Sequence, residues 1–161
     1  MKICVSHILT ALCILAAFAF APRTAFSQMT QEQLQALDEA VVQGRSEPTG
    51  TWTATLKSAD YVIHNFHFKD GETLKEMKIH YYTLGSPQRD SSGKVSNAVL
   101  ILHGTGGTGR QFFVSYFSGV VFGPGQLLDA QKYFIILPDN IGHGRSSKPS
   151  DGLRAKFPHY D

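Results

Sequence analysis

The apolar and polar positions between residues 61 and 137 follow the short periods of β-strands. Residues 61–68 are aromatic and β-branched, Asp70-Gly71 is a turn signal, and apolar and polar side chains alternate over 78–84. This pattern predicts a β-hairpin. Residues 98–102 and 133–137 are instead short continuous apolar runs, which are typical of strands buried on both faces of a parallel sheet. An antiparallel edge hairpin that leads into a parallel sheet indicates an α/β fold.

Helical spacing occurs in three segments. Thr30 and Gln33 form a capping-box pattern before an amphipathic stretch that Gly44 is expected to end. This helix is expected either to pack on the body of the protein or to form a mobile arm. Residues 110–117 and 126–131 are expected to form two further short helices.

Two polar segments connect these elements. Residues 43–59 contain Pro48 and Gly50, and they are expected to form an irregular linker. Residues 85–97 contain Pro87, Gly93 and four serines, which indicates a surface loop.

The first 27 residues are expected to be a signal peptide. Lys2 supplies a positive start, residues 8–21 are apolar, and Ala25-Phe26-Ser27 places small residues at the positions that a signal peptidase recognises. We expect cleavage before Gln28 and export to the periplasm or beyond the cell; an uncleaved anchor is the alternative. Three regions follow: the signal peptide (1–27), an N-terminal helix with a linker (28–59), and the main domain (60–161).

The expected cleavage changes the charge and the cysteine content. Cys4 and Cys13 both lie in the leader, so the mature chain has no cysteine to form a disulfide. Lys2 and Arg23 also lie there, so 13 of the 15 basic residues remain to face 13 acidic ones. A net charge of zero gives no electrostatic reason to expect nucleic acid or an anionic membrane as a partner.

The segment His103-Gly104-Thr105-Gly106-Gly107, which we call the glycine loop, directly follows the apolar run 98–102. Ligands of open α/β sheets bind at the carboxyl ends of the strands. Glycines there let the backbone turn sharply and leave its N–H groups uncovered. The glycine loop is therefore a candidate pocket for an anion or an oxyanion.

A second motif, Asp139-Asn140-Ile141-Gly142-His143-Gly144-Arg145-Ser146, follows the run 133–137 in the same way. Together the two motifs resemble the N-terminal half of the α/β-hydrolase superfamily, and within it the homoserine O-acetyltransferase-like proteins. The resemblance covers residues 61–161. It implies the N-terminal part of an α/β-hydrolase fold, incomplete in this chain.

This resemblance implies roles for individual residues. The backbone N–H of Thr105 is expected to donate to the oxyanion of an acyl-transfer reaction. Arg145 is a candidate for contact with a substrate carboxylate, and a solvated arginine is the alternative. The rest of the glycine loop is expected to support Thr105: His103, Gly104, Gly106 and Gly107. His143 and Asp139 are expected to have structural roles in their own turn, and His103 is expected to anchor its loop rather than to act as the catalytic base.

The resemblance also places the nucleophile, the acid and the base beyond Asp161. A nucleophile elbow has the pattern Gly-x-Ser-x-Gly. Gly144-Arg145-Ser146 begins like such an elbow, but Lys148 occupies the position of its last glycine. We therefore expect the chain alone to be inactive.

The sequence leaves two other functions open and contains one pair of histidines to consider as metal ligands. Residues 104–109 satisfy Gly-x-Gly-x-x-Gly, the dinucleotide-binding pattern, but Asp139 lies 30 residues after Gly109 instead of about 20. A non-enzymatic binding module on a hydrolase scaffold is the other alternative. His64 and His67 would face opposite sides of a strand, so no metal site is indicated.

The sequence thus predicts part of an exported, serine-dependent acyl-transfer enzyme that needs no cofactor. Its expected reaction is hydrolysis of a small-molecule ester, because acyl-CoA donors are cytoplasmic; acyl transfer of the homoserine O-acetyltransferase kind is the alternative. Residues 28–161 alone are expected to self-associate, since the strand 98–102 would present an unpaired apolar edge.

Overall fold

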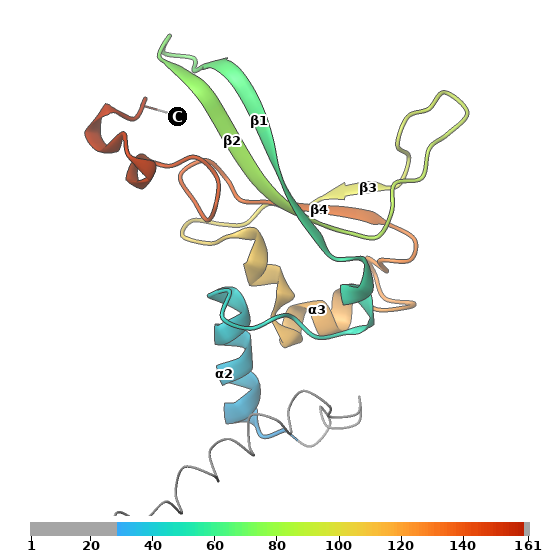
Figure 1. Cartoon of the computed structure of the whole chain (residues 1–161). Coiled ribbons are helices and arrows are strands. Elements are labelled where there is room, and N and C mark those ends of the chain that lie inside the picture. Colours follow the sequence, from blue (N-terminus) through green and yellow to red (C-terminus); the bar gives the residue numbers. More distant parts are fainter. Residues whose placement is uncertain (1–28, 160–161) are drawn as a thin grey trace, which may run out of the picture. The chain divides into compact units, whose positions relative to one another are not determined.

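The computed structural model describes residues 29–159, and from Ala36 onward these form one compact unit. Within these residues the regular elements are two α-helices, α2 (Gln31–Val42) and α3 (Ser115–Val121), and four strands, β1 (Lys57–His67), β2 (Thr73–Leu84), β3 (Ala98–Leu100) and β4 (Phe134–Pro138) (Figure 1). Four short 3₁₀ helices cover Thr51–Thr55, Gly109–Phe113, Pro149–Asp151 and Arg154–Lys156. The predicted signal peptide lies outside the described residues. None of the described helices is long and apolar enough to cross a membrane.

The four strands form one mixed sheet in the order β1-β2-β4-β3. β1 and β2 pair antiparallel, β2 pairs antiparallel with β4, and β4 pairs parallel with β3. The predicted hairpin and the predicted parallel pair are therefore both confirmed. They meet because the second half of β2 carries the apolar residues that pack beside β4.

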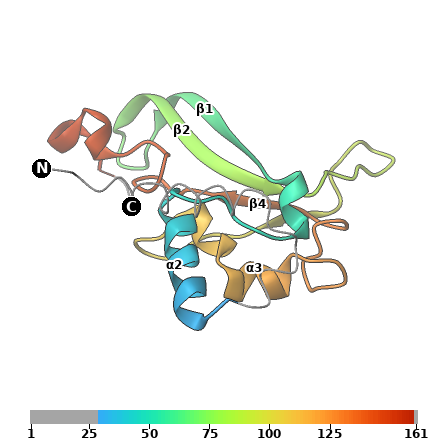
Figure 2. The same ribbon diagram turned by 60° about the horizontal axis from the view of Figure 1, so that its bottom comes forward.

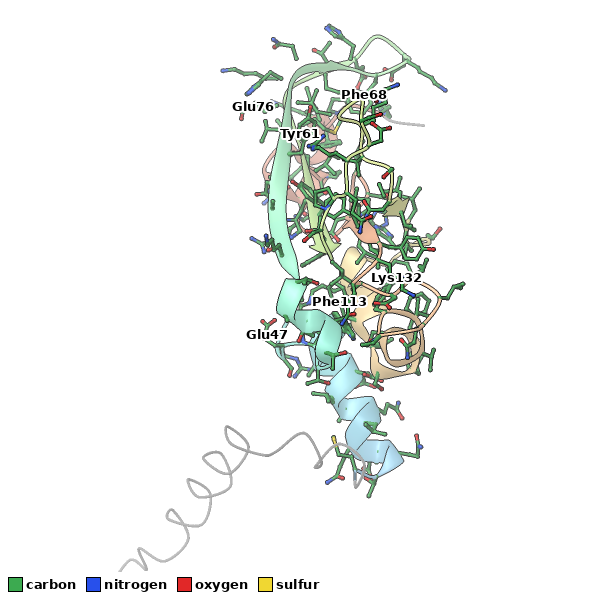
Figure 3. The ribbon with its side chains drawn as sticks, turned by 90° about the vertical axis from the view of Figure 1, so that its right-hand side faces the viewer. Glu47, Tyr61, Phe68, Glu76, Phe113 and Lys132 are labelled. Carbon is green, nitrogen blue, oxygen red and sulfur yellow. The ribbon has the colours of Figure 1, made fainter. Side chains whose placement is uncertain are left out.

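The hairpin is longer than its sequence pattern predicts. The β1–β2 register runs from Lys57 opposite Thr83 to His67 opposite Thr73, and most of β1 is exposed (Figure 3). Cross-strand hydrogen bonds extend a hairpin where no apolar alternation marks it. At its tip, Gly71 adopts φ +92° and the Asp70 carboxylate accepts the Glu72 N–H at 2.9 Å, which confirms the turn.

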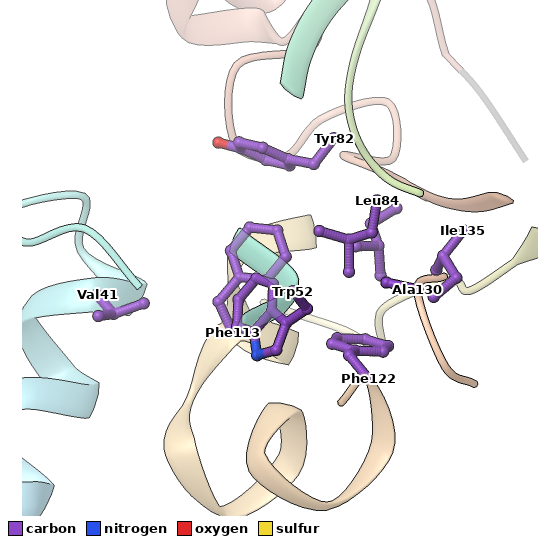
Figure 4. Close-up of a cluster of buried hydrophobic side chains, with 9 residues drawn as sticks. Val41, Trp52, Tyr82, Leu84, Phe113, Phe122, Ala130 and Ile135 are labelled. Carbon is purple, nitrogen blue, oxygen red and sulfur yellow. The ribbon is translucent and has the colours of Figure 1, made fainter. Parts of the chain in front are cut away.

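The main hydrophobic core lies between the sheet and the segments that flank it (Figures 2 and 4). Trp52 is at its centre, with its ring stacked on Phe113 at 5.5 Å and edge-on to Phe122 at 5.7 Å. The core consists of buried residues from α2, the first 3₁₀ helix, the segments that precede and follow α3 in the chain, and the sheet: Val41, Trp52, Tyr82, Leu84, Phe113, Phe122, Ala130, Ile135 and Leu137. A smaller cluster of Leu74, Met77 and Phe157 lies beneath the outer half of β2.

The structure corrects three expectations about local structure. Residues 43–59 are not wholly irregular, because Thr51–Thr55 forms a 3₁₀ helix that buries Trp52. Residues 126–131 form turns instead of a helix, because the Asp129 carboxylate accepts backbone N–H groups at 2.8 Å on either side of it. The predicted helix 110–117 is divided into the 3₁₀ helix Gly109–Phe113 and α3.

The expectation that residues 98–102 are buried on both faces is also wrong. Val99 and Ile101 pack against the main core, but Leu100 and Leu102 are 60% and 59% exposed. β3 has β4 as its only partner among the strands described, so one of its edges and one of its faces are uncovered.

The N-terminal helix matches its prediction closely. The capping box is present, since Thr30 N–H donates to Gln33 Oε1 at 2.9 Å and Gln33 N–H donates to Thr30 Oγ1 at 3.2 Å. Gly44, at φ +70°, follows the end of the helix. Val41 is only 2% exposed, so the C-terminal turn of α2 packs on the core.

Candidate functional site

The glycine loop forms a tight turn at the carboxyl end of β3. Gly107 N–H donates to Gly104 O at 3.1 Å, and Gly106 adopts φ +78°, the value required at the third position of a type II turn. Gly104, Thr105 and Gly106 are exposed. Within residues 29–159 the N–H groups of Thr105 and Gly106 have no hydrogen-bond acceptor. The loop therefore presents two adjacent free backbone donors.

His103 connects the glycine loop to the turn after β4. Its Nδ1 lies 2.8 Å from Gly104 O, and its Nε2 accepts the Asn140 N–H at 2.9 Å. A carbonyl oxygen only accepts and a backbone N–H only donates, so the ring is neutral with its proton on Nδ1. Both ring nitrogens are thus occupied, and the side chain is 5% exposed. His103 anchors two backbones and has no free nitrogen to act as a base.

Asp139 holds the same two segments together from a buried position. Its Oδ1 accepts the Gly109 N–H at 2.7 Å, and its Oδ2 accepts the Arg145 N–H at 2.8 Å. Gly144 lies directly against this carboxylate, at φ +52°, where an added Cβ would be 2.1 Å from Oδ2. The carboxylate therefore fixes its own turn and also the backbone two residues after the glycine loop. The first role was predicted from the sequence, and the second was not.

Two serine hydroxyls attach residues 139–147, the Asp139 turn, to β2. Ser146 Oγ donates to Asp139 O at 2.6 Å and accepts the His80 N–H at 2.8 Å. Ser147 Oγ accepts the Lys78 N–H at 2.9 Å. These hydroxyls replace the ladder bonds that a neighbouring strand would make. Ser146 is fully buried and its hydroxyl is used twice, so it is not placed to act as a nucleophile.

The remaining residues of the second motif differ in exposure. His143 is half-buried; its Nδ1 lies 3.1 Å from Ile141 O, and its ring packs against His103 at 5.1 Å. Arg145 is exposed, and within the described residues its side chain makes no hydrogen bond or ion pair. Its guanidinium is therefore available to an anionic group of a ligand.

A buried histidine beside this site was not singled out by the sequence. His80 is 1% exposed, its Nδ1 lies 2.5 Å from Asp60 Oδ1, and its ring meets Tyr82 edge-on at 4.9 Å. The hydrogen bond from His80 is the main cause that lowers the pKa of the Asp60 carboxyl below 3.8, while burial raises the pKa of Tyr82 above 10.0. In the described part of the chain, His80 Nε2 and Thr108 Oγ1 are buried without a hydrogen-bond partner. Neither an alternation of apolar and polar residues nor a glycine pattern indicates the pair of His80 and Asp60 in the sequence.

Neither of the other candidate sites gains support from the geometry. Residues 29–159 contain no group of three His, Cys, Asp or Glu side chains placed to hold a metal ion. His64 pairs with Glu76 at 3.6 Å on the exposed hairpin, and His67 lines a cavity of about 450 Å³ near the hairpin tip. The 104–109 pattern is followed by a 3₁₀ helix, whereas a dinucleotide site needs an α-helix that begins at the loop.

No family model matches the chain, but individual proteins do. A homoserine O-acetyltransferase from Leifsonia xyli is 31% identical over 157 residues, which cover 82% of this chain and 35% of that protein. A probable acyltransferase from Methanothermobacter thermautotrophicus is 31% identical over 106 residues, 65% of this chain and 32% of the relative. The chain thus spans about a third of the length of these curated relatives, 32% and 35%.

A solved structure shares both sequence and fold with this chain. An acetylester hydrolase from Corynebacterium glutamicum is 28% identical, with a TM-score of 0.54 over 65% of this chain and 29% of that one. This chain is related to the α/β-hydrolase superfamily. Its mixed sheet with flanking helices corresponds to part of the α/β-hydrolase fold, and the remainder of that fold is not in the residues described.

Proposed function

We propose that the chain is the N-terminal portion of an exported, serine-dependent acyl-transfer enzyme that hydrolyses small-molecule esters. The observation that carries this proposal is the free, exposed Thr105 N–H in a turn locked by His103. Acyl transfer builds negative charge on the former carbonyl oxygen, and a fixed N–H donor stabilises that charge by about 3 kcal/mol. The likeness to an acetylester hydrolase and to acetyltransferases supports acyl chemistry.

The nucleophile, the acid and the base belong, in this proposal, to the part of the relatives that the chain does not span. Ser146 supports this assignment, because both hydrogen bonds of its buried hydroxyl are internal. Oxyanion stabilisation without a nucleophile does not complete the reaction, so residues 28–161 alone have no esterase activity.

Water is the proposed acyl acceptor because export separates the enzyme from cytoplasmic acyl-CoA. The relatives named as homoserine O-acetyltransferases make transfer to an alcohol the second candidate. N-terminal sequencing of the protein from a periplasmic or culture fraction tests export: we expect Gln28 as the first residue, and Met1 on a cytoplasmic pool would refute it.

The deciding experiment uses the protein expressed from its complete gene. We expect a Gly-x-Ser-x-Gly codon pattern downstream of codon 161 and hydrolysis of p-nitrophenyl acetate. Thr105→Ala should keep most of the activity, because it retains the backbone N–H. Thr105→Pro should lower kcat by about 100-fold or more, since it removes that donor at a turn position that favours proline. Equal losses in the two variants would count against a backbone oxyanion donor.

A further inference from the structure

Two sets of polar contacts join residues 36–46 to the segment that follows the glycine loop. Arg110 donates from Nε to Val41 O at 2.7 Å and from Nη2 to Ser46 O at 2.9 Å. Asp38 accepts the Ser115 N–H at 2.7 Å and the Ser115 Oγ–H at 2.9 Å. Arg110 is the second residue of the 3₁₀ helix Gly109–Phe113, and Ser115 lies two residues after its end, so residues 36–46 contact this helix near both of its ends.

The arginine contact is specific in geometry. Val41 O lies in the last turn of α2, where carbonyls lack partners within the helix, and it accepts the Gly44 N–H at 3.1 Å as well as the bond from Arg110. The planar guanidinium donates to carbonyls in two directions, and it lies over the Tyr82 ring at 5.9 Å. A lysine carries the same charge but only a single nitrogen, so it cannot reproduce this fork.

The aspartate contact fixes the other end. Asp38 is 8% exposed, and a buried carboxylate is costly unless it is hydrogen-bonded. Ser115 satisfies one oxygen with its backbone N–H and the other with its hydroxyl. The apolar contacts of Val41 with the core would tolerate small shifts along the helix axis, but this two-point contact does not.

Movement of the 3₁₀ helix would reach the glycine loop directly. Gly109 begins that helix, donates to Asp139, and lies so close to β4 that an added Cβ would be 2.6 Å from Leu137 O. Gly109 is two residues from Gly107, whose N–H closes the turn that contains Thr105. The position of the Thr105 donor therefore depends on what holds residues 109–113.

We propose that residues 36–46 act as a brace, a segment that holds the glycine loop in position. Asp38 and Arg110 are then positioning residues for acyl transfer. This inference rests on the proposed function, since it assigns the support of the same site to a segment outside the sheet. A donor displaced by a fraction of an ångström stabilises the transition state less while substrate binding elsewhere is retained. The brace therefore acts on kcat more than on KM.

The chain supplies matched controls for both contacts. Arg89 donates from Nη1 to Gly93 O at 2.7 Å in the exposed 85–97 loop. Asp90 accepts the Ser92 N–H at 2.8 Å and the Ser92 hydroxyl at 2.7 Å, the same pair of groups that Ser115 offers to Asp38. The controls are therefore Arg89→Lys and Asp90→Ala, which disturb hydrogen bonds of the same kind away from the site.

The test compares these controls with Arg110→Lys and Asp38→Ala in the protein expressed from its complete gene. Amide hydrogen exchange at Gly109 should be about tenfold faster in the brace variants and unchanged in the controls. With p-nitrophenyl acetate, kcat should fall about tenfold while KM stays within about twofold. Ser115→Ala, which removes only the hydroxyl donor, should give a smaller loss and covers the case in which Asp38→Ala does not fold.

The two readouts separate the two proposals. A wild-type protein without esterase activity would overturn the proposed function, whereas exchange at Gly109 would still test the brace. Unchanged exchange, together with a loss of kcat no larger than in the controls, would show that residues 36–46 contribute stability only and would overturn the brace.

Discussion

Gly109→Ala tests whether the packing of one glycine holds the site in place. Gly109 is buried and its φ is not positive, so alanine can adopt its conformation and only space is at issue. An added Cβ would lie 2.6 Å from Leu137 O and 3.0 Å from Tyr82 Cδ2. The first atom belongs to the backbone of β4 and the second to a core ring, so neither can move cheaply.

The expected loss of stability follows from three contributions. Overpacking a tight site costs about 1–3 kcal/mol. Moving the backbone away from β4 breaks the 2.7 Å hydrogen bond from Gly109 N–H to the Asp139 carboxylate, a charge-assisted bond that contributes about 1.5–3 kcal/mol. Alanine restricts the conformations of the unfolded chain, and this offsets about 0.4–1 kcal/mol of the loss of stability. The net destabilisation is about 1.5–5.5 kcal/mol.

Gly104→Ala is the matched control, because Gly104 is exposed and an added Cβ there would meet nothing within 4 Å. Urea unfolding followed by circular dichroism, on the protein expressed from its complete gene, should show a change within about 0.5 kcal/mol for Gly104→Ala. A loss in Gly109→Ala equally small would refute the idea that this contact fixes the loop.

Three further predictions concern charge and association. Asp139→Asn should lower the free energy of unfolding by about 2–4 kcal/mol in the same assay, because an amide NH₂ would face one of the two N–H groups that the carboxylate accepts. The hydrogen bond from His80 lowers the pKa of the Asp60 carboxyl below 3.8. The stability that this bond contributes is therefore complete above that pH and is lost as the pH falls through the lower pKa of the folded state. Asp60→Asn should flatten the decline of the free energy of unfolding below about pH 4. Residues 28–161 expressed alone should elute from gel filtration as oligomers and leave p-nitrophenyl acetate intact, whereas a monodisperse, active monomer would contradict the proposal.

Part of the fold could be predicted from turns and helix caps that involve only neighbouring residues. The capping box of Thr30 and Gln33 and the Asp70-Gly71 turn involve neighbours in sequence, so their patterns are visible without a structure. Trp52 is different, because its burial depends on Phe113 and Phe122, which lie more than 60 residues away. For this reason the polar composition of residues 43–59 did not indicate that this segment contains a 3₁₀ helix packed in the core.

The candidate site shows the same difference between contacts of neighbouring residues and contacts of distant ones. Both motifs follow strands that pair in parallel, so the sequence could predict that they meet at one edge of the sheet. The bonds that fix them could not be predicted, because Gly109 and Asp139 are 30 residues apart and His80 and Ser146 are 66 apart. In each pair a side-chain oxygen replaces a backbone partner, and no periodicity marks that exchange.

The hydrogen bonds that hold the glycine loop bear on the acyl transfer that we propose for the complete protein. His103 and Asp139 fix the loop through partners that all lie between Gly104 and Arg145. An oxyanion donor fixed in this way is ordered before any nucleophile approaches, so little reorganisation is left for the reaction itself. The remainder of an acyl-transfer enzyme then has to bring a nucleophile and its base to a donor already in position. Variants that loosen the loop should therefore slow the chemical step even when the nucleophile is intact.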